Sequence, residues 1–257
     1  MNNQLGKHWL LLRGLTRETA HWGDFIAIMQ NQFPSAHIHT LDLPGAGRLN
    51  SQICPATISE IMESVRHSAF KQDLLQKPLT ILALSLSGMV CWEWLLKYPD
   101  DLCGAVLVNT SFAGLSPFYR RFRWQNFGKL ANIFLQKNIY DRESAIIQLV
   151  SNRLSQDAEI RREWHNIQLQ HPVSLNNGLR QIIAAARYRP KPDKPKHPVL
   201  LINSLGDQMV AQTCSTDIQN QWQLEMRTHP WAGHDLGLDD GDWLANQLKA
   251  WVTTQNH

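Results

Sequence analysis

The chain has 257 residues, of which 43% are hydrophobic and 18% are charged, and its net charge is +3. This composition excludes a largely disordered protein, and the length suits one large α/β domain or two small ones. The apolar run from Trp9 to Leu12 is too short for a signal-peptide core or a membrane span, so we expect neither. Four cysteines without a C-x-x-C pair favour reduced thiols in a cytoplasmic protein and argue against a zinc site.

Short apolar runs of β-favouring residues alternate with helical patterns along most of the chain. Strands are predicted at residues 8–14, 37–44, 79–85, 102–110 and 198–207. Helices are predicted at residues 20–33, 57–72, 91–99 and 242–252. Strands that read as nearly continuous apolar runs between helices indicate a mainly parallel sheet with both faces covered, which is an α/β fold.

The stretch from about residue 112 to 190 interrupts this alternation. It predicts helices at residues 116–136, 141–153, 157–170 and 174–188, with no strand between them. Residues 112–196 carry 15 Lys and Arg against 6 Asp and Glu, whereas the remainder of the chain is acidic. The proline-rich and basic exit at 189–198 is typical of an extended connector. We therefore predict a core of residues 1–111 and 198–257, interrupted by a helical cap insertion and its connector at 112–197.

Residues 83–90, ALSLSGMV, follow a predicted strand and place small residues around a serine. Reactive groups on a parallel sheet gather beyond the carboxyl ends of its strands, which is where Ser85 is expected. A tight strand-to-helix turn at a nucleophile needs small residues two positions before and after it, and Ala83 and Ser87 meet this need. If Ser87 were the nucleophile, the long Met89 side chain would occupy one of these positions. Ser85 is therefore the better candidate.

Five motifs occur in the order found in the α/β-hydrolase family, which the chain resembles over nearly its whole length. They are LLLRGL at 10–15, DLPGAGR at 42–48, ALSLSGMV at 83–90, SLGDQMV at 204–210 and AGHDL at 232–236. They are similar to the family's oxyanion loop, its D-x-P-G-x-G loop, its nucleophile elbow, its acid turn and its histidine loop, respectively. The helical insertion resembles the cap of small serine carboxylesterases, including the pimeloyl-carrier-protein methyl esterase of biotin synthesis.

The resemblance implies a catalytic triad in which Ser85 is the nucleophile, His234 the general base and Asp207 the acid that orients the histidine. It also implies an oxyanion hole made by the backbone N–H groups of Leu15 and Leu86. The implied activity is hydrolysis of a small-molecule carboxylic ester through an acyl-enzyme, with no metal and no cofactor.

Two of these positions have competing interpretations. His229 is a second candidate base, but Gly233 directly before His234 favours the latter. Arg13 stands before Gly14, where the family usually has a histidine. As part of the substrate pocket, Arg13 would bind a substrate carboxylate; as a structural residue, it would form an ion pair or hydrogen bond in the loop, and this second role is the one we favour.

The predicted cap has an apolar and a basic component. Its apolar residues would cover or line an acyl pocket, unless they are simply core; they are Phe112, Leu115, Phe118, Phe122, Trp124 and Phe127. Arg120, Arg121 and Arg123 belong to a basic run that either forms a pocket rim for an acyl-carrier protein or a CoA-linked substrate, or is a solvated helix face, as charge runs usually are.

The activity itself also has alternatives. Thioester hydrolysis and lactone opening use the same residues as ester hydrolysis, so the sequence does not separate them. Because Ala83 and Ser87 replace the glycines usual in the nucleophile elbow, a non-catalytic binding protein on the same fold is a further interpretation. Nucleic acid is not expected as a partner, because the basic residues belong to no identifiable binding module.

Overall fold

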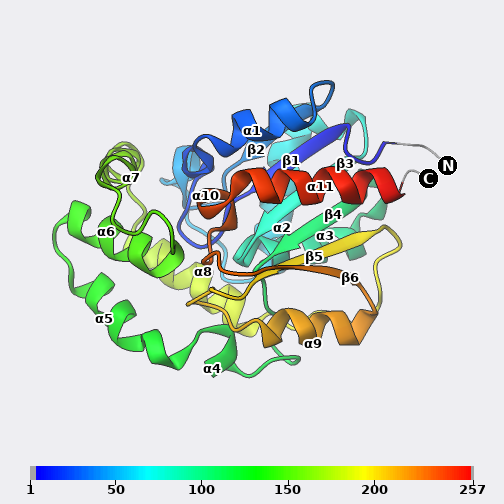
Figure 1. Cartoon of the computed structure of the whole chain (residues 1–257). Helices are drawn as coiled ribbons and strands as arrows, with labels where there is room; N and C mark the ends of the chain where they lie inside the picture. Colours follow the sequence, from blue (N-terminus) through cyan, green and yellow to red (C-terminus); the bar gives the residue numbers. More distant parts are fainter. Residues whose placement is uncertain (1–3, 256–257) are drawn as a thin grey trace.

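The computed structural model describes residues 4–255, without the side chains of Leu130 and Phe134. Its described part contains a six-stranded, all-parallel sheet with the strand order β2-β1-β3-β4-β5-β6 (Figure 1). The strands are β1 (His8–Leu12), β2 (His37–Leu41), β3 (Leu79–Leu84), β4 (Leu102–Val108), β5 (Val199–Ser204) and β6 (Glu225–His229). The predicted α/β class is confirmed, and each of the five predicted strands contains the observed one.

Strand β6 and the helix before it were not predicted. β6 lies at the edge of the sheet, and its first four residues, EMRT, are exposed or half-buried. An edge strand needs no continuous apolar run, because one of its sides is not paired and its faces are only partly covered. The apolar pattern that identified the other strands is therefore missing here.

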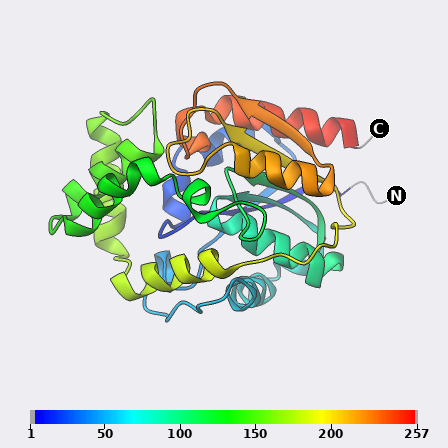
Figure 2. The ribbon, with the colours of Figure 1, turned by 90° about the horizontal axis from the view of Figure 1, so that it is seen from below.

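Helices cover both faces of the sheet (Figures 1 and 2). One face packs against α1 (Phe25–Gln32) and α11 (Gly241–Gln255), and the other packs against α2 (Ile58–Lys71), α3 (Leu86–Lys97) and α9 (Thr213–Trp222). Side chains alternate along each strand, so Trp9 and Leu11 pack on the first side and Leu10 and Leu12 on the second. Each face consequently has its own buried apolar cluster, and the sheet lies between them.

The helical segments differ most from the prediction at two points. Gly23, at φ 47°, divides the helix expected at 20–33 into the 3-10 helix η1 (Thr19–Trp22) and α1. The helix expected at 116–136 is also wrong, because Phe122 and Arg123 are extended and the Arg123 N–H donates to the Met209 carbonyl oxygen at 2.8 Å. The four other 3-10 helices of the described chain are Gly47–Leu49, Leu74–Gln76, Pro99–Asp101 and Trp124–Asn126.

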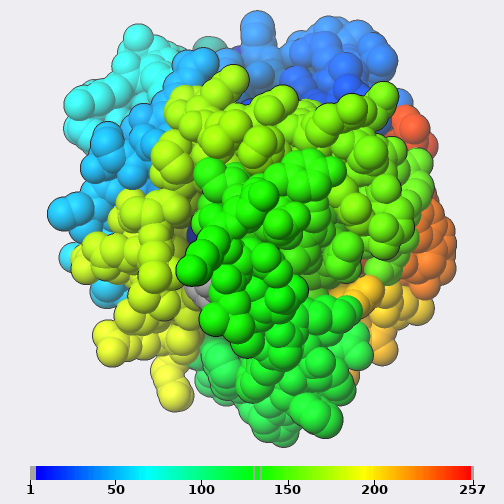
Figure 3. All heavy atoms as spheres, turned by 90° about the vertical axis from the view of Figure 1, so that its left-hand side faces the viewer, coloured from blue at the N-terminus to red at the C-terminus, as the bar shows by residue number. Residues whose placement is uncertain are grey.

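An insertion of helices lies between β4 and β5. It consists of α4 (Phe118–Arg121), α5 (Phe127–Leu135), α6 (Ile139–Val150), α7 (Ala158–Gln170) and α8 (Leu175–Arg187). Figures 1 and 2 place these helices at one end of the sheet, and Figure 3 shows the face of the molecule that they form. Helices α5, α6 and α7 have an apolar cluster of their own, built around Ile147 and Trp164. A short helix, α10 (Leu236–Asp239), follows β6. In residues 4–255 no helix is long and apolar enough to cross a bilayer.

Candidate active site

Ser85 lies in a strained turn between β3 and α3. Its backbone angles are φ 62° and ψ −118°, which is unfavourable for a residue with a side chain. Neighbouring groups hold the turn: the Ser85 N–H donates to the Val108 carbonyl oxygen at 2.8 Å, and Thr110 Oγ1 donates to the Ser85 carbonyl oxygen at 2.7 Å. A Cβ at Gly88 would lie 2.6 Å from Thr110 Oγ1, so the turn also depends on the missing side chain there. A strained turn between a strand and a helix is the geometry that a nucleophile elbow requires.

Ser87, two residues later, is in a different environment. It is fully buried, and its hydroxyl lies 2.8 Å from the Leu12 carbonyl oxygen and 2.9 Å from that of Leu84. The hydroxyl thus ties the first turn of α3 to the ends of two strands. It is not among the groups that line the cavity to which Ser85 contributes.

His234 and Asp207 form a buried pair next to the same cavity. Asp207 follows β5 and His234 follows β6, and His234 Nδ1 lies 2.8 Å from Asp207 Oδ2. The other carboxylate oxygen of Asp207 accepts the N–H groups of Met209, at 2.7 Å, and Val210, at 2.9 Å. Because a carboxylate only accepts hydrogen bonds, this contact places the proton of a neutral His234 on Nδ1. Nε2 is then left as an acceptor, as a general base requires.

The surroundings of His234 act on its pKa in opposite directions. Burial lowers the pKa of His234, but the charge and hydrogen bond of Asp207 raise it. The charge of Asp235 also raises it, and Arg13 has a smaller lowering effect. The net result is a pKa above the ordinary value of 6.5, because the contributions that stabilise the charged imidazolium prevail.

His229, the competing histidine, is engaged elsewhere. It ends β6 and is buried, with Nε2 3.2 Å from Asp240 Oδ2. Its Nδ1 accepts the Ala232 N–H at 2.9 Å, and its ring packs edge-on against those of Trp231 and Trp243. Both ring nitrogens therefore have partners that support the loop before His234.

The loop after β1 comes close to Ser85. A Cβ at Gly14 would lie 3.0 Å from Ser85 Cβ and 3.2 Å from the Leu84 carbonyl oxygen, so the close approach depends on glycine. Among residues 4–255, neither the Leu15 nor the Leu86 N–H donates to a carbonyl oxygen in the turns and loops. Leu86 is also the first residue of α3, where helix geometry leaves the amide groups free and the end of the helix dipole is positive.

Arg13 forms a buried ion pair with Asp235. Arg13 Nη1 lies 3.2 Å from Asp235 Oδ1, Nη2 contacts Oδ2, and both residues are 2% exposed. The guanidinium also lies 4.8 Å from the centre of the Trp22 ring. The pair joins the residue before Gly14 to the residue after His234, and both of its members line the cavity.

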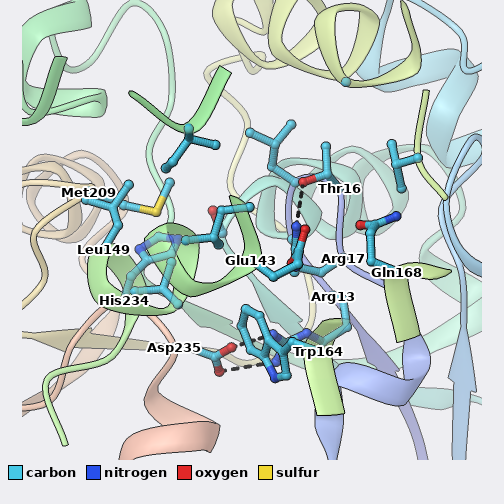
Figure 4. Close-up of a pocket in the computed structure, with 18 of the residues that line it drawn as sticks. Arg13, Thr16, Arg17, Glu143, Leu149, Trp164, Gln168, Met209, His234 and Asp235 are labelled. Carbon is cyan, nitrogen blue, oxygen red and sulfur yellow. Dashed lines mark hydrogen bonds and ion pairs between the residues drawn. The ribbon is translucent and has the colours of Figure 1, made fainter. Parts of the chain in front are cut away.

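A cavity of about 280 Å³ connects these residues with the helical insertion. In Figure 4, Leu149 and Met209 lie near His234, whereas Thr16, Arg17 and Gln168 lie on the other side. Arg17 Nη1 contacts Glu143 Oε2 at 2.5 Å in this polar part. The larger apolar wall comes from β3 and from α5 to α8, and it includes Leu84, Ile133, Ile146, Leu149, Trp164 and Ile182.

Several residues expected at the pocket lie outside it. Arg120 and Trp124 are exposed, Arg121 Nη2 donates to the Ala185 carbonyl oxygen at 2.6 Å, and Arg123 Nη1 donates to that of Asp207 at 2.7 Å. None of these four side chains lines the cavity. The same holds for the expected aromatic lining: Phe112 belongs to the core, and Phe118 and Phe127 are exposed.

Sequence reasoning also missed the residues that do form the wall, such as Ile133, Trp164 and Glu143. Their helical spacing showed an apolar side of each helix, but not which helix faces the cavity. Within the part of the chain that the structure describes, no group of three or more His, Cys, Asp or Glu side chains is placed to hold a metal ion.

Comparisons with known proteins agree with this fold. The model of a family described as "alpha/beta hydrolase fold" matches residues 10–240, whereas a search of curated proteins finds no match. An esterase from Rhodococcus sp. ECU1013 has a similar structure, with 13% identity, a TM-score of 0.76, and coverage of 98% of this chain and 92% of that chain. A thermophilic esterase from Thermogutta terrifontis has 16% identity, a TM-score of 0.74, and coverage of 97% and 90%.

The enol-lactonase from Burkholderia xenovorans LB400 is another similar structure, with 15% identity, a TM-score of 0.73, and coverage of 95% of this chain and 91% of that chain. At such identities these structures show a shared fold and nothing finer. The family model, in contrast, spans most of the chain, from within β1 to beyond the end of β6. The chain therefore belongs to the α/β-hydrolase fold family.

Proposed function

We propose that the protein is a serine hydrolase that cleaves carboxylic esters of small molecules through an acyl-enzyme on Ser85. The observation that supports this most strongly is that Ser85, in a strained turn, lines the same cavity as His234, which is paired with Asp207 at 2.8 Å. The family includes hydrolases, and two of the similar structures are named esterases.

In the first half of the proposed reaction, Ser85 Oγ attacks the ester carbonyl carbon while His234 Nε2 takes the hydroxyl proton. Asp207 keeps the imidazole oriented and stabilises the imidazolium that forms. The N–H groups of Leu15 and Leu86 donate to the oxyanion of the tetrahedral intermediate. The carbon–oxygen bond to the leaving group then breaks, and the proton passes from Nε2 to the departing alcohol oxygen.

In the second half, water attacks the acyl-enzyme. His234 Nε2 takes a proton from the water, a second tetrahedral intermediate forms, and its collapse returns the proton to Ser85 Oγ and releases the carboxylic acid. In each half of the reaction, His234 Nε2 takes one proton from the attacking oxygen and gives it to the departing oxygen. The histidine is therefore neutral again at the end of each half.

The insertion at 112–197 acts as the cap of this site in our proposal. Helices α5, α6, α7 and α8 all contribute residues to the cavity wall, so the substrate would bind between them and the strand ends. At about 280 Å³ the cavity is close to the lower limit, about 300 Å³, of common ligand pockets. This size and the apolar wall favour a short or medium acyl chain.

Labelling with a fluorophosphonate probe tests the proposal directly. We expect the probe to modify the folded protein at one serine, which mass spectrometry of the digested protein identifies as Ser85. Ser85→Ala should abolish the modification, and the matched Ser87→Ala variant should retain it because that hydroxyl is buried away from the cavity. If the folded protein stays unlabelled while a known serine esterase reacts, a non-catalytic binding protein is the better interpretation.

The pH dependence of ester hydrolysis should report the His234 base. The neutral imidazole is the active form, so kcat/KM is expected to rise with pH through an acidic limb whose midpoint lies above 6.5. In Asp207→Asn, the contributions of Asp207 that raise the pKa of His234 are lost while burial still lowers it, so the limb should move to lower pH. An unmoved limb in this variant would mean that a different group titrates.

A further inference from the structure

Exposed apolar side chains lie on two of the helices that line the cavity. We call the following five residues of α5 and α8 the mouth rim: Phe127, Leu135, Leu175, Leu179 and Ile183. Leu135 is 77% exposed and Leu175 is 64% exposed. The same two helices supply the cavity wall, for example Ile133 from α5 and Ile182 from α8. Figure 3 shows the surface hollowed between the yellow-green α8 and green α5, with blue atoms of the N-terminal part of the chain visible inside.

Helix α8 has its polar and apolar sides reversed relative to an ordinary surface helix. Leu175, Leu179 and Ile183 are spaced by four residues and form one exposed stripe, whereas Asn177 and Gln181 are buried. The buried amides have specific partners, so their position is not accidental. Asn177 Nδ2 donates to the carbonyl oxygen of residue 52 at 2.9 Å, and Gln181 Oε1 accepts the N–H of residue 16 at 2.8 Å. The helix is thus held firmly with its apolar stripe toward solvent.

The segments that carry the mouth rim hold charges of one sign. Residues 112–140 and 174–192, which contain α4, α5 and α8, hold nine Lys and Arg and no Asp or Glu. Six of these cations are exposed, and they are Arg120, Lys129, Lys137, Arg187, Arg189 and Lys191. Tyr119 and Trp124, whose aromatic side chains each carry a polar group, are more than half exposed in the same region. Positive charges beside exposed apolar side chains favour a partner that has an anionic surface and an apolar interior.

We propose that the mouth rim docks on an anionic lipid surface, with the opening of the cavity turned toward the lipid. The Leu, Ile and Phe side chains would enter the boundary between headgroups and acyl chains, while the flanking cations contact the headgroups. Tyr119 and Trp124 suit the same boundary, where such side chains are enriched. An amphiphilic ester could then pass from the lipid into the cavity between α5 and α8. This docking goes beyond ester hydrolysis and does not require it.

Co-sedimentation of the full chain with lipid vesicles tests the proposal. We expect binding to vesicles of phosphatidylcholine mixed with phosphatidylglycerol, weaker binding to phosphatidylcholine alone, and a loss of binding as salt is raised. The double variant Leu135→Glu/Leu179→Glu should lower the partition coefficient by about tenfold or more, because it places charge where apolar groups enter the lipid. Phe70→Glu is the matched control: Phe70 is 65% exposed on α2, outside the insertion, and its variant should bind like the parent.

A second double variant, Arg187→Glu/Arg189→Glu, tests the charge separately from the apolar side chains. It should weaken binding to the mixed vesicles and leave the low binding to phosphatidylcholine unchanged. Thermal unfolding of each variant shows that the fold is kept, which is expected because all four positions are exposed. The proposal is overturned if the parent does not sediment with the mixed vesicles, or if both double variants bind as tightly as the parent. Sedimentation measures no turnover, so vesicle binding by a chain whose Ser85 is unreactive would contradict the proposed function alone.

Discussion

Ser85→Ala is expected to lower kcat/KM for p-nitrophenyl ester hydrolysis by about 10⁴-fold or more, because the acyl-enzyme cannot form without the hydroxyl. The remaining rate would come from the oxyanion hole and from binding alone. Comparing p-nitrophenyl esters from acetate to laurate measures the effect at each chain length. For the parent protein, the acyl chain length with the highest kcat/KM also indicates which acyl group fits best in the cavity of about 280 Å³.

Ser87→Ala is the control for this variant. The Ser87 hydroxyl contacts the carbonyl oxygens of Leu12 and Leu84 in the core, so its loss should reduce the free energy of unfolding by about 1 kcal/mol. Activity on the same esters should remain within a few-fold of the parent. The opposite pattern, an inactive Ser87→Ala and an active Ser85→Ala, would assign the nucleophile to the other serine.

The sheet was largely predictable because its central strands are buried on both faces. Strands β3, β4 and β5 are covered by helices from both sides, which demands continuous apolar runs such as LTILAL and VLLINS. β6 lacks this signal because it is an edge strand with half-exposed side chains. Local patterning thus identified every strand that is buried on both faces, whereas of the two half-exposed edge strands it identified β2 and missed β6.

The site divides in the same way. The three predicted triad positions follow the ends of three strands, and a parallel sheet brings all such ends to one edge. Their roles stay a prediction, but their proximity followed from topology. The residues of the cavity wall did not follow from topology. The sequence shows apolar sides on α5 to α8, but it does not show which of them faces the cavity. In α8, buried Asn177 and Gln181 are fixed by distant loops, and no periodicity within the helix reveals those partners.

Arg13→Met is expected to reduce the free energy of unfolding by about 3–5 kcal/mol, which chemical denaturation measures. Arg13 and Asp235 are both 2% exposed, so removing the cation leaves a carboxylate buried without its partner. Asp235 has one further contact, from the Leu238 N–H at 3.3 Å, which does not replace the lost charge. The double variant Arg13→Met/Asp235→Asn should recover part of the loss, because neither charge is then left alone. Equal stability of the two variants would contradict this account of the pair.

The Arg13–Asp235 pair is also expected to shift the pKa of His234. The direction of the shift in each variant distinguishes this charge effect from a simple loss of structure. Arg13 lowers the pKa of His234 and Asp235 raises it. Removing Arg13 should therefore move the acidic limb of kcat/KM to higher pH, and Asp235→Asn should move it to lower pH. A loop that is merely loosened would lower kcat in both variants without opposite shifts. Opposite limb shifts would show that the Arg13–Asp235 pair, which adjoins both Gly14 and His234, sets the pKa of His234 through its charges.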